Sequence, residues 1–161
     1  MPTLELLRPD HAAAVLAFET ENRAYFAAVI PDRGDDFFAD YPARHAALLE
    51  MQEAGTDRFH VLVAEDGTIA GRFNLLHIAA GEADLGYRMG EAFAGRGLAT
   101  RAVADICELA RSAYGLQRLR AAATVDNPAS KAVLLRNGFR LSGSAVLNGR
   151  PAETFRLTLP N

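Results

Sequence analysis

The chain has 161 residues, of which 50% are hydrophobic and 23% are charged, as is typical of one globular domain with a sizeable core. Its formal net charge of −3 argues against nucleic acid as the main partner. No run of about 18 apolar residues could span a membrane, and Met1–Glu5 lacks the basic start of a signal peptide. We therefore expect a cytoplasmic protein without a membrane partner and with a single domain over residues 1–161.

The first half of the chain predicts a strand, two helices and three further strands. Asp10 is the expected N-cap of the first helix, and Gly55 ends the second. The segment Ile30–Tyr41 is rich in aspartate and contains Pro31 and Gly34, which predicts a mobile loop. The predicted elements are a strand over Thr3–Arg8, helices over His11–Phe26 and Pro42–Ala54, and strands over Phe59–Glu65, Thr68–Ile78 and Glu82–Met89.

The second half predicts two helices that alternate with strands and a closing hairpin. Apolar residues recur at helical spacing in the first of these helices, which Gly115 ends. Asn127 is the expected N-cap of the second, and Asn148-Gly149 predicts a type I′ turn. The elements are helices over Leu98–Tyr114 and Pro128–Asn137, and strands over Arg118–Thr124, Phe139–Leu147 and Ala152–Leu159. The order indicates an α/β fold with helices on the faces of one sheet.

The turn Ala94–Thr100 is the most informative segment, because a strand enters it and a helix leaves it. Glycines at such a turn leave backbone N–H groups free to bind an anion at the positive end of the helix dipole. The pattern of a nucleotide P-loop is absent, and Thr100 replaces the third glycine of a dinucleotide fingerprint. An ordinary tight strand–helix connection, without any ligand, is the alternative at this point.

From Ala83 to Phe139 the chain resembles the GNAT superfamily of N-acetyltransferases, whose turn has the pattern [QR]-x-x-G-x-[GA]. Gly97 and Ala99 match that pattern, whereas Ala94 departs from its first position. The segments that resemble the branch acetylating ribosomal-protein N-termini are Leu85-Gly86-Tyr87-Arg88-Met89, Gly95-Arg96-Gly97-Leu98-Ala99-Thr100, Asn127-Pro128-Ala129-Ser130 and Asn137-Gly138-Phe139. The resemblance implies a single GNAT-like domain, with a mixed, mostly antiparallel central sheet that is flanked by helices and splayed near Met89.

The resemblance also implies acetyl-CoA as co-substrate, with its pyrophosphate on the backbone N–H groups of the glycine turn. The strand before the turn would hold the acetyl group and the pantetheine arm through its backbone. Plain strand pairing and helix capping are the alternatives for these residues. The expected CoA-binding residues are Tyr87, Arg88, Met89, Gly95, Arg96, Gly97, Leu98, Ala99, Thr100, Asn127 and Ser130. The four histidines lack the spacing of metal ligands, so no metal site is expected.

The reaction that the resemblance implies is direct transfer of the acetyl group to an amine. Asp84, with Glu82 on the same strand face, matches the position of a carboxylate base, although a solvated acidic strand end is the alternative. Leu134 occupies the position of the family's acidic tyrosine, so Ser130 is the candidate that protonates the leaving thiolate. Glu19 and Glu21 on the first helix are further candidates for the base, with surface charges or contacts to the substrate's amine as the alternatives.

The predicted function is therefore N-acetylation of an amine, with a protein N-terminal α-amine as the first candidate acceptor. An antibiotic or metabolite amine is the alternative acceptor, and a non-catalytic acyl-CoA-binding module is the alternative class. The first two helices, the segment Ile30–Tyr41 and the final hairpin are expected to set acceptor specificity. Exposed strand edges near that hairpin permit a homodimer. Cys107 is expected to be a buried structural thiol rather than a nucleophile.

Overall fold

A single mixed sheet organises the computed structural model, which describes all residues from 1 to 161. Its seven strands lie in the order β1-β2-β3-β4-β5-β7-β6, and only the β4–β5 pair is parallel. The predicted mixed, mostly antiparallel sheet is thus confirmed. The strands are β1 (Thr3–Leu6), β2 (Arg58–Val63), β3 (Ile69–Ala79), β4 (Glu82–Met89), β5 (Arg118–Thr124), β6 (Arg140–Leu147) and β7 (Arg150–Thr158).

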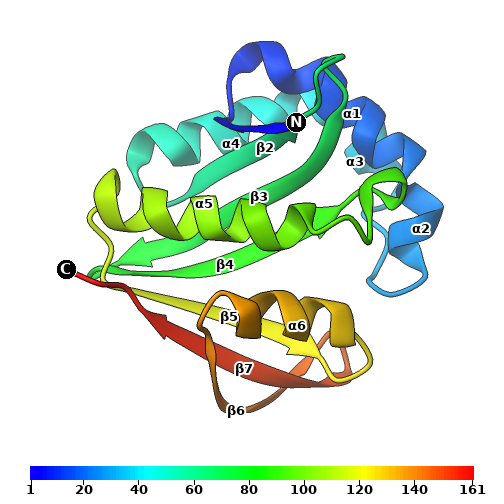
Figure 1. Cartoon of the computed structure of the whole chain (residues 1–161). Helices are drawn as coiled ribbons and strands as arrows, with labels where there is room; N and C mark the ends of the chain where they lie inside the picture. The colour runs from blue at the N-terminus through cyan, green and yellow to red at the C-terminus, as the bar shows by residue number, and fades with distance from the viewer.

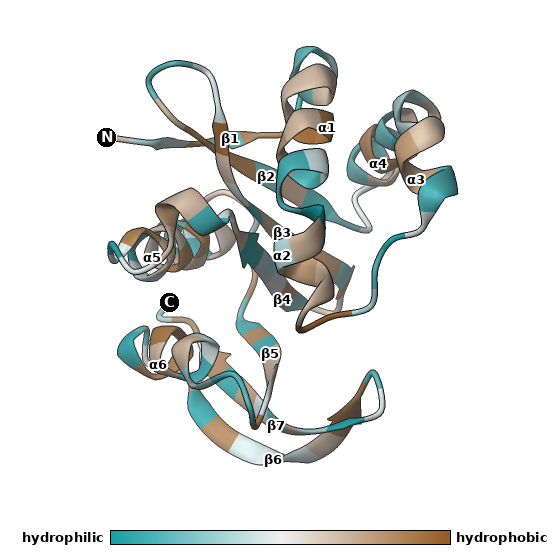
Figure 2. Ribbon diagram, turned by 90° about the vertical axis from the view of Figure 1, so that its right-hand side faces the viewer, coloured by the Kyte–Doolittle hydropathy of each residue, from teal (hydrophilic) through white to brown (hydrophobic).

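Helices cover both faces of this sheet, as Figures 1 and 2 show from two sides. The later helices, α5 and α6, lie on one face, and the four earlier helices lie on the other. None of the helices has the length and apolar character that a membrane crossing requires. The helices are α1 (Ala12–Glu21), α2 (Arg23–Ala27), α3 (Asp35–Ala39), α4 (Tyr41–Ala54), α5 (Leu98–Ser112) and α6 (Pro128–Arg136), with 3₁₀ turns at Pro9–His11 and Glu91–Phe93.

The hydrophobic core is divided by the sheet into two clusters. The larger contains 19 buried residues, including Phe73, Ile106 and Phe155, and lies between the sheet and α5 and α6. The smaller contains 9 buried residues, including Val15 and Tyr41, beneath the earlier helices. Side chains of successive residues in a strand point to opposite faces of the sheet. Consecutive residues along β3, and likewise along β4, therefore face different core clusters.

The two central strands separate part-way along their length. β4 and β5 pair only at Glu82–Arg118, Ala83–Leu119 and Asp84–Arg120. Beyond Asp84, β4 continues beside β3 as far as Met89, and β5 continues beside β7 as far as Thr124. The splay that was expected near Met89 therefore opens directly after Asp84, and it leaves facing edges of two strands without sheet partners.

Most local sequence signals agree with the structure. Gly55 has φ of +80° and ends α4, as predicted. Asn148 and Gly149, with φ of +53° and +77°, form the predicted turn between β6 and β7. Both residues adopt the left-handed region that a type I′ turn requires.

The N-terminal helical region departs from the prediction in two respects. The expected single helix over His11–Phe26 is interrupted at Asn22 and divided into α1 and α2. The prediction that Asp10 is its N-cap is wrong, because Asp10 lies inside a 3₁₀ turn and its carboxylate pairs with Arg8 at 3.1 Å. His11 occupies the N-cap position of α1 without a side-chain cap.

The segment Ile30–Tyr41 is also more ordered than a mobile loop. It contains α3, and the aromatic rings of Phe37 and Tyr41 are buried at a centroid distance of 5.3 Å. Burial of two aromatic rings anchors this segment to the smaller core cluster. The prediction of a mobile loop was wrong because it relied on the proline, glycine and aspartates of this segment. It did not consider that the paired phenylalanines could be buried and anchor the segment.

Strand β6 forms one edge of the sheet, and all its residues are exposed. Leu141 and Val146 are among the large hydrophobic side chains that this edge presents to solvent. The homodimer that this edge permits stays a prediction.

The lack of space for a side chain at Gly71, on β3 beside β4, predicts a stability effect. A Cβ added at Gly71 would lie 2.7 Å from Met89 Sδ and 3.0 Å from the Arg88 carbonyl oxygen. Gly71→Ala should therefore lower the free energy of unfolding by about 1–3 kcal/mol, measured by urea denaturation. Gly86→Ala is the matched control, because a Cβ there meets nothing within 4 Å. Equal unfolding free energies for the two variants would contradict this packing.

Candidate functional site

A cavity of about 320 Å³ lies where β4 and β5 separate. Its walls come from β3, β4, β5, the start of α6, the segment after α2 and the β6–β7 turn. Four of the predicted site residues line it: Tyr87, Arg88, Asn127 and Ser130. The remaining lining residues are Val29, Ile30, Arg33, Arg72, Asn74, Gly86, Ala122, Ala123, Thr124, Leu147, Asn148 and Arg150.

Two hydroxyl groups meet at the wall of this cavity. The phenol of Tyr87 donates a hydrogen bond of 3.4 Å to Ser130 Oγ, and its ring stacks on Phe73 at 5.3 Å. Burial raises the pKa of Tyr87, against a smaller opposing effect of Ser130, so the phenol is neutral and can donate a proton. Sequence reasoning assigned Tyr87 only a backbone role, because no local signal connects it to a serine 43 residues later.

Helix capping positions Ser130 without occupying its hydroxyl. The Asn127 side chain accepts a hydrogen bond of 3.2 Å from the backbone N–H of Ser130, so Asn127 is the predicted N-cap of α6. Because the cap uses the backbone of Ser130, its Oγ remains available to the cavity. The motif from Asn127 to Ser130 thus places a helix cap and a free hydroxyl group together at the start of α6.

The glycine turn leads into α5 with its backbone donors free. Gly95 and Gly97 have φ of +75° and +74°, which explains the need for glycine at both positions. The first helical hydrogen bond runs from Arg101 N to the Gly97 carbonyl, and no side chain caps this end. The N–H groups of Leu98, Ala99 and Thr100 therefore lack a helical acceptor and suit an anion.

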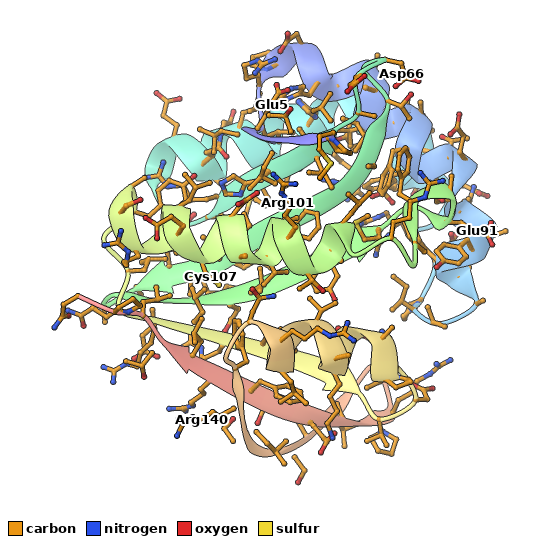
Figure 3. All side chains as sticks on the ribbon, viewed as in Figure 1. Glu5, Asp66, Glu91, Arg101, Cys107 and Arg140 are labelled. Carbon is orange, nitrogen blue, oxygen red and sulfur yellow. The ribbon has the colours of Figure 1, made fainter.

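The surroundings of the turn are open and well anchored. Arg96 is exposed and lies over the ring of Phe93 at 5.7 Å. The side-chain amide of Asn137 donates to the Thr100 carbonyl at 3.1 Å, which ties the end of α6 to the start of α5. Figure 3 shows Arg101 one helical turn into α5, on the long helix that follows this site.

The two predicted carboxylates lie at the closed end of the β4–β5 pair rather than on the cavity wall. Arg120 donates to Asp84 at 2.7 Å and to Glu82 at 2.8 Å, and His77 Nδ1 lies 2.9 Å from Asp84. Burial raises the pKa of Asp84, but the hydrogen bonds of Arg120 and His77 outweigh it and the net pKa is lowered. Their role as bases stays a prediction, and neither contacts the cavity directly.

Glu19 is the residue that sequence reasoning placed least accurately. It is not a surface charge, since its side chain is only 1% exposed and lies beneath the cavity. Arg33, Arg72 and Arg88 bind its two oxygens at 2.8, 2.7 and 3.1 Å. Burial raises the pKa of Glu19, but the three guanidinium groups together hold it below its usual value. These arginines come from three separate segments, so no local pattern identifies the cluster.

The guanidinium of Arg88 has a perturbed pKa. Burial and the nearby charge of Arg33 lower its pKa to about 10, against the attraction of Glu19. It nevertheless stays charged near neutral pH. The cavity wall thus carries a fixed positive charge.

Cys107 lies on α5 (Figure 3). It is half-buried rather than fully buried, and it is not among the residues that line the cavity. Burial raises the pKa of its thiol to about 11, so the group is neutral at physiological pH and a poor nucleophile.

Comparison with known proteins connects this geometry to one family. The sequence pattern of the acetyltransferase (GNAT) domain matches residues 3–140. A relative in Bacillus subtilis (strain 168), the probable N-acetyltransferase YjcK, is 29% identical over 140 residues, which cover 83% of this chain and 77% of the relative.

Solved structures share the whole fold. The ribosomal-protein-S5-alanine acetyltransferase from Vibrio fischeri has a TM-score of 0.91 and 23% identity, covering 97% of this chain and 92% of that one. The spermidine N-acetyltransferase from Vibrio cholerae, in complex with CoA and spermine, has a TM-score of 0.78 and 16% identity, covering 98% and 95%. Several of the similar structures contain CoA.

The buried position of Glu19 predicts a pH-dependent loss of stability. Glu19→Gln should lower the free energy of unfolding by about 3–5 kcal/mol, because three arginines lose their common counter-charge. The pKa of Glu19 is lower in the folded chain than in the unfolded chain, so its contribution is complete above about pH 4.3 and disappears as the pH falls further. Urea denaturation at several pH values measures both effects.

The exposed Glu108→Gln variant is the control, since Glu108 pairs only with Arg111 on the surface of α5. Its unfolding free energy should stay close to that of the wild type, because solvent screens this exposed pair. A Glu19→Gln variant with the stability and acid sensitivity of the wild type would contradict the structural role of Glu19.

Proposed function

The chain belongs to the GNAT acetyltransferase family, and on that premise we propose that it transfers the acetyl group of acetyl-CoA to an α-amino group at a protein N-terminus. The observation that carries this proposal is the cavity between the separated strands β4 and β5, with the hydroxyl of Ser130 on its wall. Acetyl-CoA is the co-substrate, and it supplies the thioester whose acyl carbon accepts the amine.

The residues of the splay and of the glycine turn suit this co-substrate. The unpaired N–H groups at the start of α5 are proposed to bind the pyrophosphate, with Arg96 adding positive charge from the exposed side. The backbone of Tyr87–Met89 is proposed to hold the pantetheine arm and to donate a hydrogen bond to the acetyl oxygen. Ala94 offers no side-chain ligand, so binding at the turn rests on backbone groups.

Transfer requires two proton movements in addition to bond exchange. The amine nitrogen forms a bond to the acyl carbon, the carbon–sulfur bond breaks, the nitrogen loses one proton and the thiolate sulfur gains one. We assign the second movement to Ser130, which would donate its hydroxyl proton to the sulfur and take one from Tyr87, whose phenolate regains a proton from solvent. The proton lost by the nitrogen passes to water. Leu134, at the position where the family carries a tyrosine, is buried and provides no proton.

An α-amine is the acceptor that this site can serve with modest help. Its pKa of about 8 leaves a useful neutral fraction at pH 7, whereas a lysine amine of about 10.4 needs a stronger base. The cavity offers no carboxylate on its wall. Glu82 and Asp84, the carboxylate candidates for the base, could act only through intervening water. The weak demand for a base is what favours an α-amine over a lysine side chain.

The test of the function is thiol release from acetyl-CoA in the presence of N-terminal peptides, lysine side-chain amines and small amines. Release with α-amino peptides supports the proposal. CoA binding without release on any amine would instead support the non-catalytic acyl-CoA-binding module. Release only with small-molecule amines would support the small-molecule acetyltransferase.

Removal of the two cavity hydroxyls predicts graded losses of turnover. Ser130→Ala should lower kcat about tenfold or more because the thiolate loses its proton donor. Tyr87→Phe keeps the ring stack on Phe73 and removes one hydrogen bond, so a fall of about two- to tenfold is expected. Ser144→Ala, on the exposed edge strand, is the matched control and should leave kcat unchanged. Full turnover by Ser130→Ala would remove that serine from the mechanism.

Because the carboxylate of Asp84 is already paired, we expect that its replacement by an amide has only a small effect on kcat. Asp84→Asn keeps the size of the side chain, and kcat should fall by less than about threefold because Asp84 lies outside the cavity and its carboxylate is already paired. A fall of about a hundredfold or more, with loss of the acidic limb of the pH profile, would establish Asp84 as the base. Steady-state kinetics across the pH range measure this difference.

A further inference from the structure

Positive charge dominates the wall of the cavity. Its four charged lining residues are all arginines, Arg33, Arg72, Arg88 and Arg150, and no aspartate or glutamate lines it. Arg33 and Arg88 keep 31% and 21% of their side chains exposed, whereas Arg72 is almost fully buried. The side chains of the first two therefore keep some exposed surface on the cavity wall.

The neighbouring carboxylates compensate only part of this charge. Glu19 is the common partner of Arg33, Arg72 and Arg88, so three cations share one anion. Arg150 has its own partner, Asp126, at 3.1 Å. The cavity therefore keeps an excess of positive charge, in surroundings where burial strengthens electrostatic interactions.

The proposed CoA site does not account for these arginines. Tyr87 and Met89 pack with the core cluster that includes the buried residues of α5, whereas Arg88 reaches Glu19 on α1. Adjacent strand residues point to opposite faces, so the sheet lies between the arginine cluster and the start of α5. The pyrophosphate at that helix start would lie on the other side of the sheet (Figure 2).

A second, independent feature lies on the same wall. The side-chain oxygen of Asn74 is buried and has no hydrogen-bond partner in the protein. Asn74 lies opposite Gly86 in the β3–β4 register, and a Cβ at Gly86 would meet nothing within 4 Å. The missing side chain leaves room beside Asn74, at the strand that borders the splay. An amine donor there would satisfy an oxygen that is otherwise unpaired.

We propose that the acceptor carries a side-chain carboxylate a few bonds away from its α-amine. The carboxylate binds the partly exposed side chains of Arg33 and Arg88, while the amine donates to Asn74 beside the splay. This inference rests on the proposed acetyl transfer and specifies the substrate class of the same cavity. A polyamine is disfavoured, because its several positive charges would meet an arginine wall without a carboxylate to receive them.

The required chemistry has two sources, which are an N-terminal aspartyl or glutamyl residue of a polypeptide and a free acidic amino acid. Both present an α-amine and a side-chain carboxylate in the same arrangement. They differ in what is attached to the first carbonyl carbon. In the polypeptide, this is the rest of the chain. The experiment therefore includes both sources.

The test is a comparison of kcat/KM for thiol release from acetyl-CoA by the wild-type protein. The peptides are identical except for an N-terminal Asp, Asn or Lys, and free aspartate, free asparagine and spermidine complete the set. The Asp peptide should exceed its isosteric Asn partner by about ten- to a hundredfold, as for a charge-assisted hydrogen bond. The difference should shrink at high salt, and the Lys peptide and spermidine should be the poorest acceptors.

A matched pair of arginine variants locates the effect. Arg33→Gln should reduce the ratio of Asp to Asn kcat/KM by about fivefold or more, because one guanidinium leaves the cavity. Arg111→Gln removes the same charge from the outer surface of α5, where Arg111 pairs with Glu108, and should leave the ratio unchanged. The ratio within each variant is independent of how much of the protein is folded.

The outcomes distinguish the failure of the carboxylate inference from the failure of the proposed function. Equal kcat/KM for the Asp and Asn peptides, or a preference for Lys or spermidine, would overturn the carboxylate inference and leave acetyl transfer standing. Turnover of free aspartate over free asparagine, without turnover of peptides, would support the carboxylate and overturn the N-terminal acceptor. Bound CoA without release on any amine would overturn the proposed function and this inference together.

Discussion

The separation of β4 from β5 after Asp84 is the constraint on which the rest of the site depends. Three residue pairs hold the strands together, and beyond them each strand keeps only its outer neighbour. The pairing ends beside Arg120, whose guanidinium links Glu82 and Asp84 across the junction. Backbone groups that a continuous sheet would consume are thereby left available, and a cavity of about 320 Å³ forms in a fold that is otherwise closely packed.

Different elements bring the chemistry of the cavity to this opening. Ser130 lies at the start of α6, and Tyr87 lies on β4. The free N–H donors at the start of α5 lie on one side of the sheet. On the other side, α1 contributes Glu19, which collects arginines from β3, β4 and the segment after α2. The sheet thus divides a region suited to an anionic, nucleotide-like co-substrate from the arginine-lined region that we propose faces the acceptor.

Glu19 shows how stability and specificity are connected in this protein. A buried carboxylate with three arginine partners holds α1 against β3 and β4 and fixes the guanidinium groups in place. Its single charge does not neutralise them, so the same cluster that secures the fold leaves a positive cavity. The solved structures of this fold include both a ribosomal-protein acetyltransferase and a spermidine acetyltransferase, which means that the fold alone does not choose the acceptor. We propose that the charge of the cavity wall contributes to that choice.

The sequence by itself determined the features that short-range chemistry controls. The ends of β4 and β5, the left-handed glycines of the turn, the Asn127 cap and the Asn148-Gly149 hairpin all follow from local backbone preferences. The order of motifs from Leu85 to Phe139 carried the resemblance to the family, which the match over residues 3–140 confirms. Only the tertiary structure decided that Glu19 is buried, that Tyr87 meets Ser130, that Arg120 pairs with both carboxylates and that Phe37 anchors the segment before α4. These contacts join residues far apart in the chain, and a sequence pattern carries no record of which distant partner compensates a charge or covers a ring.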